Sequence, residues 1–396
     1  MMPARYFWMV LPIIFGVSAP VHATTQDNEH PGTSPKLFVE QIFPITDFPP
    51  EHEILSVDPG LPERSRKLSE ALVRHVQATD YYKRGLRKYG RRHYKSALKY
   101  FEKALALNPD FYFVHNDRGL VYKKLGRMQD AIASFSAALD IKPDYYMAYN
   151  NRGIVHETLG HSDQAMADYT AAITADPFYP YVYFNRGNIH KKKGDDALAI
   201  ADYSEAIKLK FDYAPAYNNR GILYQKGKKF DEALADYEKA IEWNPEYAFA
   251  FNNMAIIYEN RESWDKALEF YSRAIDIDPD YQTAYYNRGN VYRKTAQWKQ
   301  AVKDYSRVIK MDRTLAKAYY QRGRAYKEMG QYRKSIRDLS KVIAIGQGFK
   351  ESYLQRADAY LKLKKTKQGL QDIEKARELG LQVSDDYLRR LEHAAE

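Results

Sequence analysis

The five residues Tyr-Asn-Asn-Arg-Gly occur twice in this chain, at Tyr149–Gly153 and at Tyr217–Gly221. Near copies begin at Tyr183 (YFNRG), Tyr285 (YYNRG) and Tyr319 (YYQRG). Each copy lies in a stretch whose core-type residues recur every three or four positions, which is typical of a helix. A glycine inside a helix costs about 1 kcal/mol relative to alanine. Its repeated use here therefore indicates close packing of that helix against a neighbour.

The glycines are spaced by 34 residues or a multiple of 34. They are Gly85, Gly119, Gly153, Gly187, Gly221, Gly289 and Gly323. A fixed period of this length predicts a stack of structural repeats. With the glycine as position 8, nine gapless repeats follow, at 78–111, 112–145, 146–179, 180–213, 214–247, 248–281, 282–315, 316–349 and 350–383.

Each repeat contains two helical patterns. Positions 4, 8 and 11 carry an aromatic residue, Gly or Ala, and Tyr or His, while positions 20, 24 and 27 carry Ala, an aromatic residue and Ala. Both sets place one face of a helix toward a core. Proline at position 32 ends the second helix, as at Pro143 and Pro245. We therefore predict antiparallel helix pairs that bury their apolar faces by stacking.

The order aromatic, Gly, Tyr, Gly, aromatic, Ala, aromatic, Ala, Pro at positions 4, 8, 11, 15, 17, 20, 24, 27 and 32 resembles the tetratricopeptide repeat (TPR) family. It is nearly complete in repeats 112–145 and 214–247. The resemblance implies an all-α, right-handed superhelical solenoid of antiparallel helix pairs. The last repeat departs from the pattern at Ala357, Gly369 and Leu381, which suits a terminal capping repeat.

The two ends of the chain differ from the repeats. A cleavable signal peptide is predicted at residues 1–23 from Arg5, the apolar run from Tyr6 to Val17 and the small residue Ala23. The alternatives are an uncleaved anchor and a chance apolar start. Residues 24–62 hold seven prolines and predict a mostly irregular, extended linker, which either stays a tether or packs on the repeats. Capping helices are expected at 63–77 and 384–396. The chain is thus predicted to be exported and periplasmic.

The composition argues against an enzyme. The absence of Cys excludes disulfides, a thiolate metal site, a cysteine nucleophile and lipid attachment near the cut. The ten His residues show no metal-ligand spacing, and no phosphate-binding loop or Ser–His–Asp arrangement is recognisable. We expect no cofactor, no metal, no nucleic acid and no transmembrane span. A net charge of +10, spread along the chain, favours acidic partners.

Charged residues also recur in register. Position 7 is Arg in eight repeats and position 23 is Asp in six, whereas repeat 248–281 carries Met254 and Phe270 at these two places. The joint loss of both charges suggests that the two positions touch. The alternative is a stripe of arginines that binds anions. The predicted structural ion pairs are Arg152–Asp168, Arg186–Asp202, Arg220–Asp236, Arg288–Asp304 and Arg322–Asp338.

The opposite face of the first helix is left for binding. Positions 2, 5, 9, 12 and 13 lie on it, flanked by position 6, which is Asn in five consecutive repeats. An Asn amide matches the hydrogen-bonding groups of a peptide backbone. With helices about 8–10 Å apart, one amide meets about every third residue of an extended chain. Helix caps or solvated filler are the alternative. The predicted groove residues are Asn151, Asn185, Asn188, Asn219, Asn253, Asn287, Asn290, Gln321, Lys192, Lys226, Lys294, Tyr286 and Tyr320.

The amide row resembles the asparagine ladder in the TPR superhelix of O-GlcNAc transferase, which implies a grip on the backbone of an extended peptide. Exported bacterial TPR proteins with similar repeats serve as adaptors of envelope enzymes or as parts of polysaccharide-export machines. We therefore predict a non-enzymatic scaffold that binds an extended, acidic segment of a partner protein in envelope protein processing or assembly. The alternative is a glycan-binding component of a polysaccharide export or secretion machine, because tyrosine rings also stack on sugars.

Overall fold

The structure is a computed structural model that describes residues 63–346 and 350–383. These residues form helices joined by short turns, without a strand. The chain divides into two compact units, residues 1–161 and 162–396, which are described separately below. The predicted signal peptide, the proline-rich segment 24–62 and the expected helix at 384–396 lie outside the described residues. Within the described ranges, no helix has both the length and the apolar character needed to cross a membrane.

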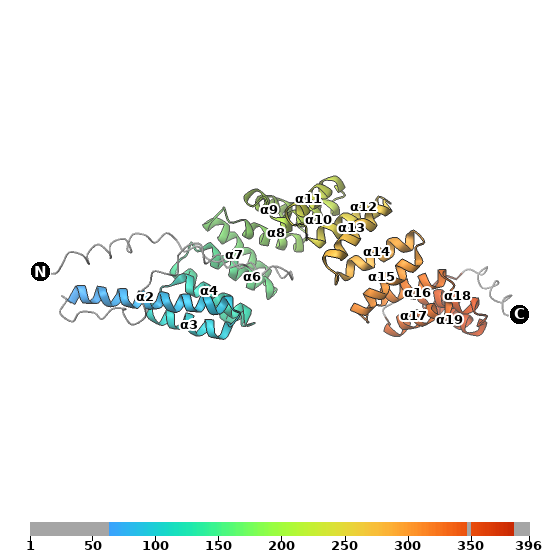
Figure 1. The fold of residues 1–396 in the computed structure, drawn as a ribbon, viewed down its shortest axis with the longest axis horizontal. Helices are drawn as coiled ribbons and strands as arrows, with labels where there is room; N and C mark the ends of the chain where they lie inside the picture. Colours follow the sequence, from blue (N-terminus) through green and yellow to red (C-terminus); the bar gives the residue numbers. More distant parts are fainter. Residues whose placement is uncertain (1–62, 347–349, 384–396) are drawn as a thin grey trace. The chain divides into compact units, whose positions relative to one another are not determined.

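The first unit consists of helix pairs in sequence order (Figure 1). α2 packs against α3 and α4 packs against α5, while α3–α4 and α5–α6 contacts join successive repeats. Each pair is one sequence repeat, so the period of the sequence sets the period of the fold. The helices are α2 (Glu63–Gly90), α3 (Tyr94–Leu107), α4 (Tyr112–Lys124), α5 (Met128–Ile141) and α6 (Tyr146–Thr158).

The start of α2 differs from the expectation of a separate capping helix at 63–77. One continuous helix runs from Glu63 to Gly90 instead. No glycine or proline stands between Glu63 and Gly85, so the chain lacks a signal that would end a helix at residue 77. Residues 63–77 therefore lengthen the first helix of the first repeat.

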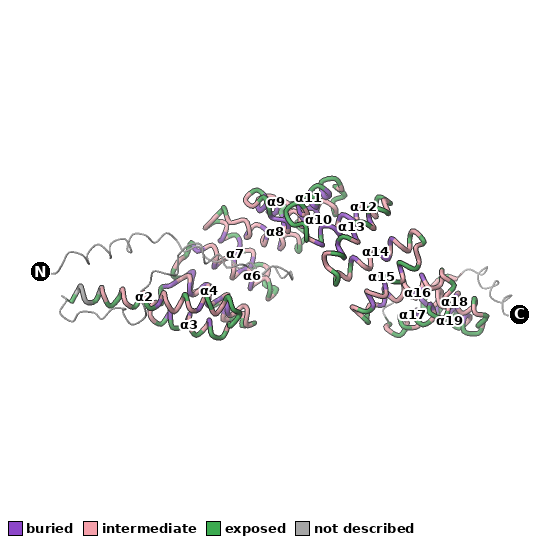
Figure 2. Tube along the Cα trace, viewed as in Figure 1, coloured by how far each residue is buried: buried purple, intermediate pink, exposed green. Residues whose placement is uncertain are grey.

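The second unit continues the same arrangement (Figure 1). Each first helix contacts the second helix of its own repeat, and each second helix contacts the first helix of the next repeat. Figure 2 shows buried residues recurring along these helices. The helices are α7 (Ser162–Ala175), α8 (Pro180–Lys193), α9 (Asp196–Leu209), α10 (Ala214–Lys226), α11 (Phe230–Trp243), α12 (Ala248–Asn260), α13 (Trp264–Ile277), α14 (Gln282–Lys294), α15 (Trp298–Met311), α16 (Ala316–Glu328), α17 (Tyr332–Ile345), α18 (Glu351–Lys362) and α19 (Thr366–Glu378).

The position-8 glycines let the two helices of a pair approach closely. A Cβ atom added at Gly221 would lie 2.7 Å from the ring of Tyr237, which is fully buried. The same holds for Gly289 and the ring of Tyr305, at 2.8 Å. The aromatic residue at position 24 thus occupies the space that a side chain at position 8 would need. This contact offsets the cost of glycine within a helix.

The turn between the two helices uses a left-handed residue at position 15. Gly126, Gly194 and Gly330 have φ angles of 74°, 88° and 70° there. Other repeats place non-glycine residues in the same conformation, including Lys228 at 60° and Ala296 at 55°. The turn is therefore set by the helix pair, and glycine only makes it less strained.

Each first helix buries two faces, whereas the sequence analysis assigned it one. Position 8 packs on the second helix of the same repeat, as predicted. Positions 3, 5 and 10 are also buried, as at Ala216, Asn218 and Leu223 in α10. Ala216 and Leu223 pack in one cluster with Tyr203 of α9, the second helix of the preceding repeat. Asn218 accepts a hydrogen bond from Asn253 of α12, the first helix of the next repeat. Position 5 was expected on an open face, and its asparagines instead lie between helices.

Candidate functional site

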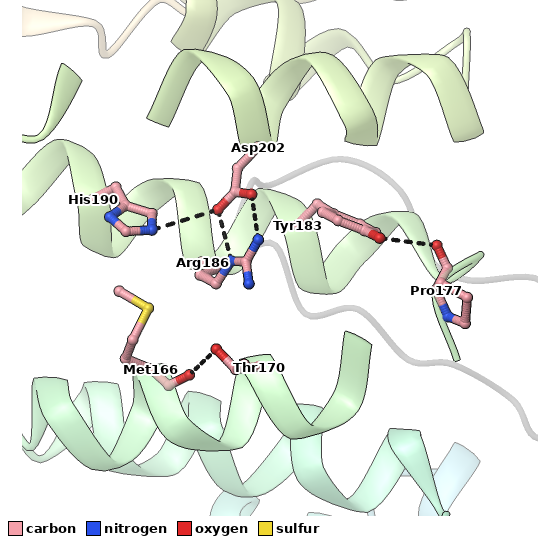
Figure 3. Close-up of polar contacts among 7 residues, drawn as sticks. All are labelled: Met166, Thr170, Pro177, Tyr183, Arg186, His190 and Asp202. Carbon is pink, nitrogen blue, oxygen red and sulfur yellow. Dashed lines mark hydrogen bonds and ion pairs between the residues drawn. The ribbon is translucent and has the colours of Figure 1, made fainter. Parts of the chain in front are cut away.

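The predicted ion pairs of the second unit lie between the two helices of each repeat. Figure 3 shows Arg186 of α8 facing Asp202 of α9. Its Nε and Nη2 atoms donate to the two carboxylate oxygens at 2.9 and 2.7 Å. His190 Nε2 lies 3.8 Å from the same carboxylate. This two-bond geometry fixes the orientation of both side chains.

The same contact recurs along the second unit. Bidentate pairs join Arg220–Asp236, Arg288–Asp304, Arg322–Asp338 and Arg356–Asp372. The last of these was not among the predicted pairs, although it follows the same register. The aspartates are buried, so each guanidinium is the counter-charge of a carboxylate that water does not reach. This arrangement leaves the position-7 arginines of these repeats little capacity to bind anions from solution.

Two further contacts of these arginines were missed by sequence reasoning. Nη1 of Arg220 donates to Ser204 of the preceding repeat at 2.9 Å. The rings of Tyr217 and Tyr224 lie 5.7 and 5.8 Å from the same guanidinium carbon. The sequence contained a signal for these contacts, because serine recurs at position 25 and tyrosine at positions 4 and 11. Arg288, Arg322 and Arg356 form the same bond to a serine, so these arginines link their own helix pair to the preceding repeat.

Repeat 248–281 replaces the ion pair with an apolar contact. Met254 is buried and Phe270 packs against the same cluster. The ring of Phe270 also stacks on Tyr258 with a centroid distance of 5.3 Å. An apolar pair therefore occupies the positions that carry charge elsewhere.

The arginines at position 7 of the first unit have other partners than an aspartate at position 23. Arg118 donates to Ser134 at 3.2 Å, and Arg84 pairs with Asp80 on its own helix at 2.7 Å. Arg152 of the first unit donates to Ser136 at 2.9 Å. Asp168 belongs to the second unit, and the predicted pairing of Arg152 with Asp168 stays a prediction.

The position-6 asparagines form hydrogen bonds between repeats. Asn151, Asn219, Asn253 and Asn287 each donate an Nδ2–H to the amide oxygen of an asparagine in the preceding repeat. We call this set the amide ladder. Its bonds run from Asn151 to Asn116, from Asn219 to Asn188 and from Asn253 to Asn218 at 2.9 Å, and from Asn287 to Asn252 at 3.4 Å. The ladder therefore joins first helices of neighbouring repeats.

The ladder leaves part of each position-6 amide unused. Asn219, Asn253 and Asn287 are half-buried, whereas Asn218 and Asn252 are 4% and 3% exposed. An Asn side chain has two N–H donors. Among the described residues, the second Nδ2–H of Asn253 and Asn287 has no recorded acceptor. Asn185 is also half-buried, on α8, and Gln321 accepts a long bond of 3.5 Å from Arg324.

Several other predicted groove residues have partners within the protein. Asn188 and Asn290 accept hydrogen bonds from the buried hydroxyls of Tyr203 and Tyr305, both at 2.8 Å. Burial raises the pKa of the Tyr305 hydroxyl above its ordinary value, so it stays a donor. The two position-9 asparagines are half-buried, and each satisfies a buried tyrosine hydroxyl.

The predicted groove lysines differ from one another. Lys226 pairs with Asp196 at 2.6 Å, and Lys294 pairs with Glu259 at 3.0 Å. Lys192 is exposed on α8 and forms no ion pair among the described residues. The two predicted tyrosines, Tyr286 and Tyr320, are half-buried on α14 and α16. No group of His, Asp or Glu in the described ranges is arranged to hold a metal ion.

The first unit has one acidic member at position 6. Asp117 accepts from Tyr82 Oη at 2.7 Å and from Asn116 Nδ2 at 3.1 Å. Burial raises the pKa of this carboxyl to about 6, although both hydrogen bonds favour its charged form. The pKa of Tyr82 is raised well above its ordinary value, first by burial and then by the charge of Asp117.

Comparison with protein families identifies the repeats. Models described as tetratricopeptide repeat match residues 82–146, 148–179, 214–247, 236–269 and 316–345, and a model described as TPR repeat matches residues 187–227, 257–296 and 289–330. The chain belongs to the tetratricopeptide repeat family. TPR proteins are typically non-enzymatic scaffolds for protein–protein interaction, and the matches indicate no catalytic family.

Solved structures show the same fold. The Cut9–Hcn1 hetero-tetramer of the APC/C is 15% identical, with a TM-score of 0.51 over 67% of this TPR chain and 52% of that chain. A TPR protein from Parabacteroides merdae is 20% identical, with a TM-score of 0.47 over 63% of this chain and 98% of its own. YrrB, described as a TPR protein with an unusual peptide-binding site, is 25% identical, with a TM-score of 0.40 over 46% and 95% of the two chains. Comparison with curated proteins gave no match.

Proposed function

We propose that this TPR protein is a non-enzymatic adaptor that binds an extended segment of a partner protein along the amide ladder of its second unit. The observation that carries the proposal is the row Asn219, Asn253 and Asn287, in which each amide is half-buried and already held by one hydrogen bond. A donor held in a fixed direction loses less conformational freedom when it binds a ligand. The second N–H of each amide is the group we assign to the ligand.

The spacing of the row suits a peptide backbone. Packed helices lie about 8–10 Å apart and an extended chain advances about 3.3 Å per residue. One amide thus meets a backbone carbonyl at about every third residue. Because backbone groups are the same in all sequences, the ladder would supply affinity and other side chains would supply selectivity.

A partner protein explains the tyrosines better than a glycan does. Sugar stacking needs an open aromatic face. Tyr286 packs on Tyr305 with a centroid distance of 5.9 Å, and Lys317 Nζ lies 4.6 Å from the centroid of the Tyr286 ring. The ring therefore has little free face to offer a sugar. Glycan binding remains the alternative outcome of the test below.

We place this activity in the cell envelope on the strength of the sequence of residues 1–23. An exported adaptor would bring a client protein to an envelope protease or to an assembly factor. The placement rests on the signal-type pattern alone.

The test compares two double variants that break the same two ladder bonds. N253A/N287A removes the half-buried donors, whereas N218A/N252A removes their buried acceptors. Each protein is immobilised and offered a pool of random, end-blocked peptides of about nine residues, which would span three repeats. Bound peptide is quantified by mass spectrometry, and thermal unfolding is recorded for each variant. A pool of neutral and acidic oligosaccharides is offered in parallel.

We expect N253A/N287A to bind the peptide pool about tenfold more weakly, because two hydrogen bonds are worth about 1–3 kcal/mol together. N218A/N252A should unfold at a lower temperature and bind about threefold more weakly than wild type, because it keeps the two donors but no longer holds them in a fixed direction. Equal binding losses in the two variants would assign the ladder to folding alone. Capture of oligosaccharides in place of peptides would replace the proposal with the glycan alternative.

A further inference from the structure

Three basic side chains stand on the neighbouring first helices α14 and α16. Lys317 of α16 lies over the ring of Tyr286 of α14, at 4.6 Å from its centroid. Arg324 lies 5.7 Å from the ring centroid of Tyr320, one turn away on α16. Arg293 stands near the end of α14, where its Nε atom is buried and has no hydrogen-bond partner among the described residues. We call Arg293, Lys317 and Arg324 the basic cluster.

The guanidinium groups of Arg293 and Arg324 affect the pKa of the same two tyrosine hydroxyls, those of Tyr305 and Tyr320. Burial raises the pKa of Tyr305, whereas the charge of Arg293, a hydrogen bond with its side chain and the charge of Arg324 lower it. Burial also raises the pKa of Tyr320, again against Arg324 and Arg293. The two arginines, from different repeats, therefore lie around one site.

The basic cluster has no counter-charge of its own. Neighbouring cations on the same face are paired, as in Lys294–Glu259 and Lys327–Asp358, at 3.0 and 2.9 Å. Among the described residues, Arg293, Lys317 and Arg324 form no ion pair. The charge of Glu351 reaches Tyr320, yet no ion pair joins it to the cluster. Arg293 and Arg324 are half-buried, and like charges close to one another disfavour each other's charged form unless an anion lies between them.

We propose that the basic cluster is a specificity subsite for the carboxylate of a Glu or Asp side chain in the bound segment, an inference that rests on the proposed peptide-binding function. Guanidinium groups bind carboxylates through paired, charge-assisted hydrogen bonds. The carboxylate would lie between α14 and α16 and accept from Arg293 and Arg324. Gln321, on the same face of α16, would hold the adjoining backbone.

A peptide carboxylate fits this site better than an acidic polysaccharide. Cations already lie over the rings of Tyr286 and Tyr320, which removes the aromatic platforms that a uronic acid chain would use. The adjoining groups are amides, including Asn287 of the amide ladder. Such groups match a peptide backbone on either side of an acidic residue.

The test offers the full protein two end-blocked peptide pools of about nine residues, with a fixed central Glu in one and Gln in the other. Wild type is compared with R293Q/R324Q and with K299Q/K303Q. The second variant removes the same charge from exposed positions on α15. An oligogalacturonate is offered as the glycan probe. Affinities are measured at low and high salt, with thermal unfolding as the check on folding.

Wild type and K299Q/K303Q should prefer the Glu pool about tenfold, since a hydrogen bond to a charged group is worth about 1.5–3 kcal/mol. The preference should weaken in high salt. R293Q/R324Q should bind both pools equally, at the level that wild type shows for the Gln pool. Equal binding of both pools by wild type would overturn the subsite and leave the proposed function standing. Binding of neither pool would overturn both, and tighter binding of oligogalacturonate would overturn the choice of a peptide.

Discussion

At the scale of single residues, Asp117 shows how one change alters the ladder position. It stands at position 6, which is Asn in the five repeats that follow. Tyr82 and Asn116 donate to it, and burial still raises the pKa of its carboxyl from 3.8 to about 6. Between these two pH values the folded chain holds a proton that the unfolded chain has released. Stability therefore falls as pH rises through this window, and the penalty is complete above about pH 6.

We predict that D117N stabilises the protein at neutral pH. The amide keeps an acceptor for Tyr82 and carries no charge that burial would disfavour. The gain in free energy of unfolding should be about 1–3 kcal/mol at pH 7.5 and should vanish near pH 4. Urea unfolding at several pH values measures it. D140N, which removes a charge from the exposed face of α5, should stay within about 0.5 kcal/mol of wild type throughout. A constant difference between D117N and wild type across pH would contradict the assigned pKa.

The sequence predicted some of these contacts and missed others for a physical reason. Repeat 248–281 lacks both the Arg and the Asp, so their proximity was readable from Met254 and Phe270. Asn218 offered no such signal, because the pattern of one helix does not tell which of its faces meets the next repeat. The recurrence of Asn at both positions 5 and 6, 35 residues apart across repeats, was the available clue. This recurrence identifies Asn253 as the hydrogen-bond partner of Asn218 only when the packing of α10 against α12 is known.

At the scale of helix pairs, an ion pair and an apolar pair serve the same place in the fold. Arg220 and Asp236 join α10 to α11, with side chains 19% and 7% exposed. Met254 and Phe270 join α12 to α13. A buried ion pair contributes little net stability compared with apolar residues of similar volume, whereas removal of one partner leaves a charge without compensation. The role of the two side chains, charged or apolar, is therefore to fix the register of the two helices.

We predict that R220M alone destabilises the protein and that R220M/D236F recovers most of the loss. The single change leaves Asp236 buried without a counter-charge, at a cost of about 2–4 kcal/mol. The double variant copies the neighbouring repeat and should lie within about 1 kcal/mol of wild type. Ser204 keeps a partner, because its hydroxyl also donates to the Ile200 carbonyl at 2.7 Å. Chemical unfolding of both singles and the double gives the coupling, and additive losses would contradict the exchange.

At the scale of the whole molecule, the repeat period decided what the sequence was able to predict. Within residues 78–383 every helix recurs, so the pattern of one repeat supports the next. Outside that range there is no second copy to compare. Residues 63–77 show this. The boundary expected at residue 77 came from the start of the first repeat at residue 78. The sequence after Glu63 contains no signal that ends a helix, and the helix continues to Gly90.

The export of the molecule is a prediction that the repeats themselves do not address. The apolar run Tyr6–Val17, which follows Arg5, is shorter than the roughly 20 residues that span a bilayer. Ala23 presents a small residue to a signal peptidase. We expect the full chain, expressed in a Gram-negative bacterium, to be recovered from the periplasm with Thr24 as its first residue by N-terminal sequencing. A23R should block the cut and leave the chain in the membrane fraction, because signal peptidase needs a small side chain there. Recovery of the wild-type chain from membranes with residues 1–23 intact would support the anchor instead, and the adaptor would then act from a fixed position on the membrane surface.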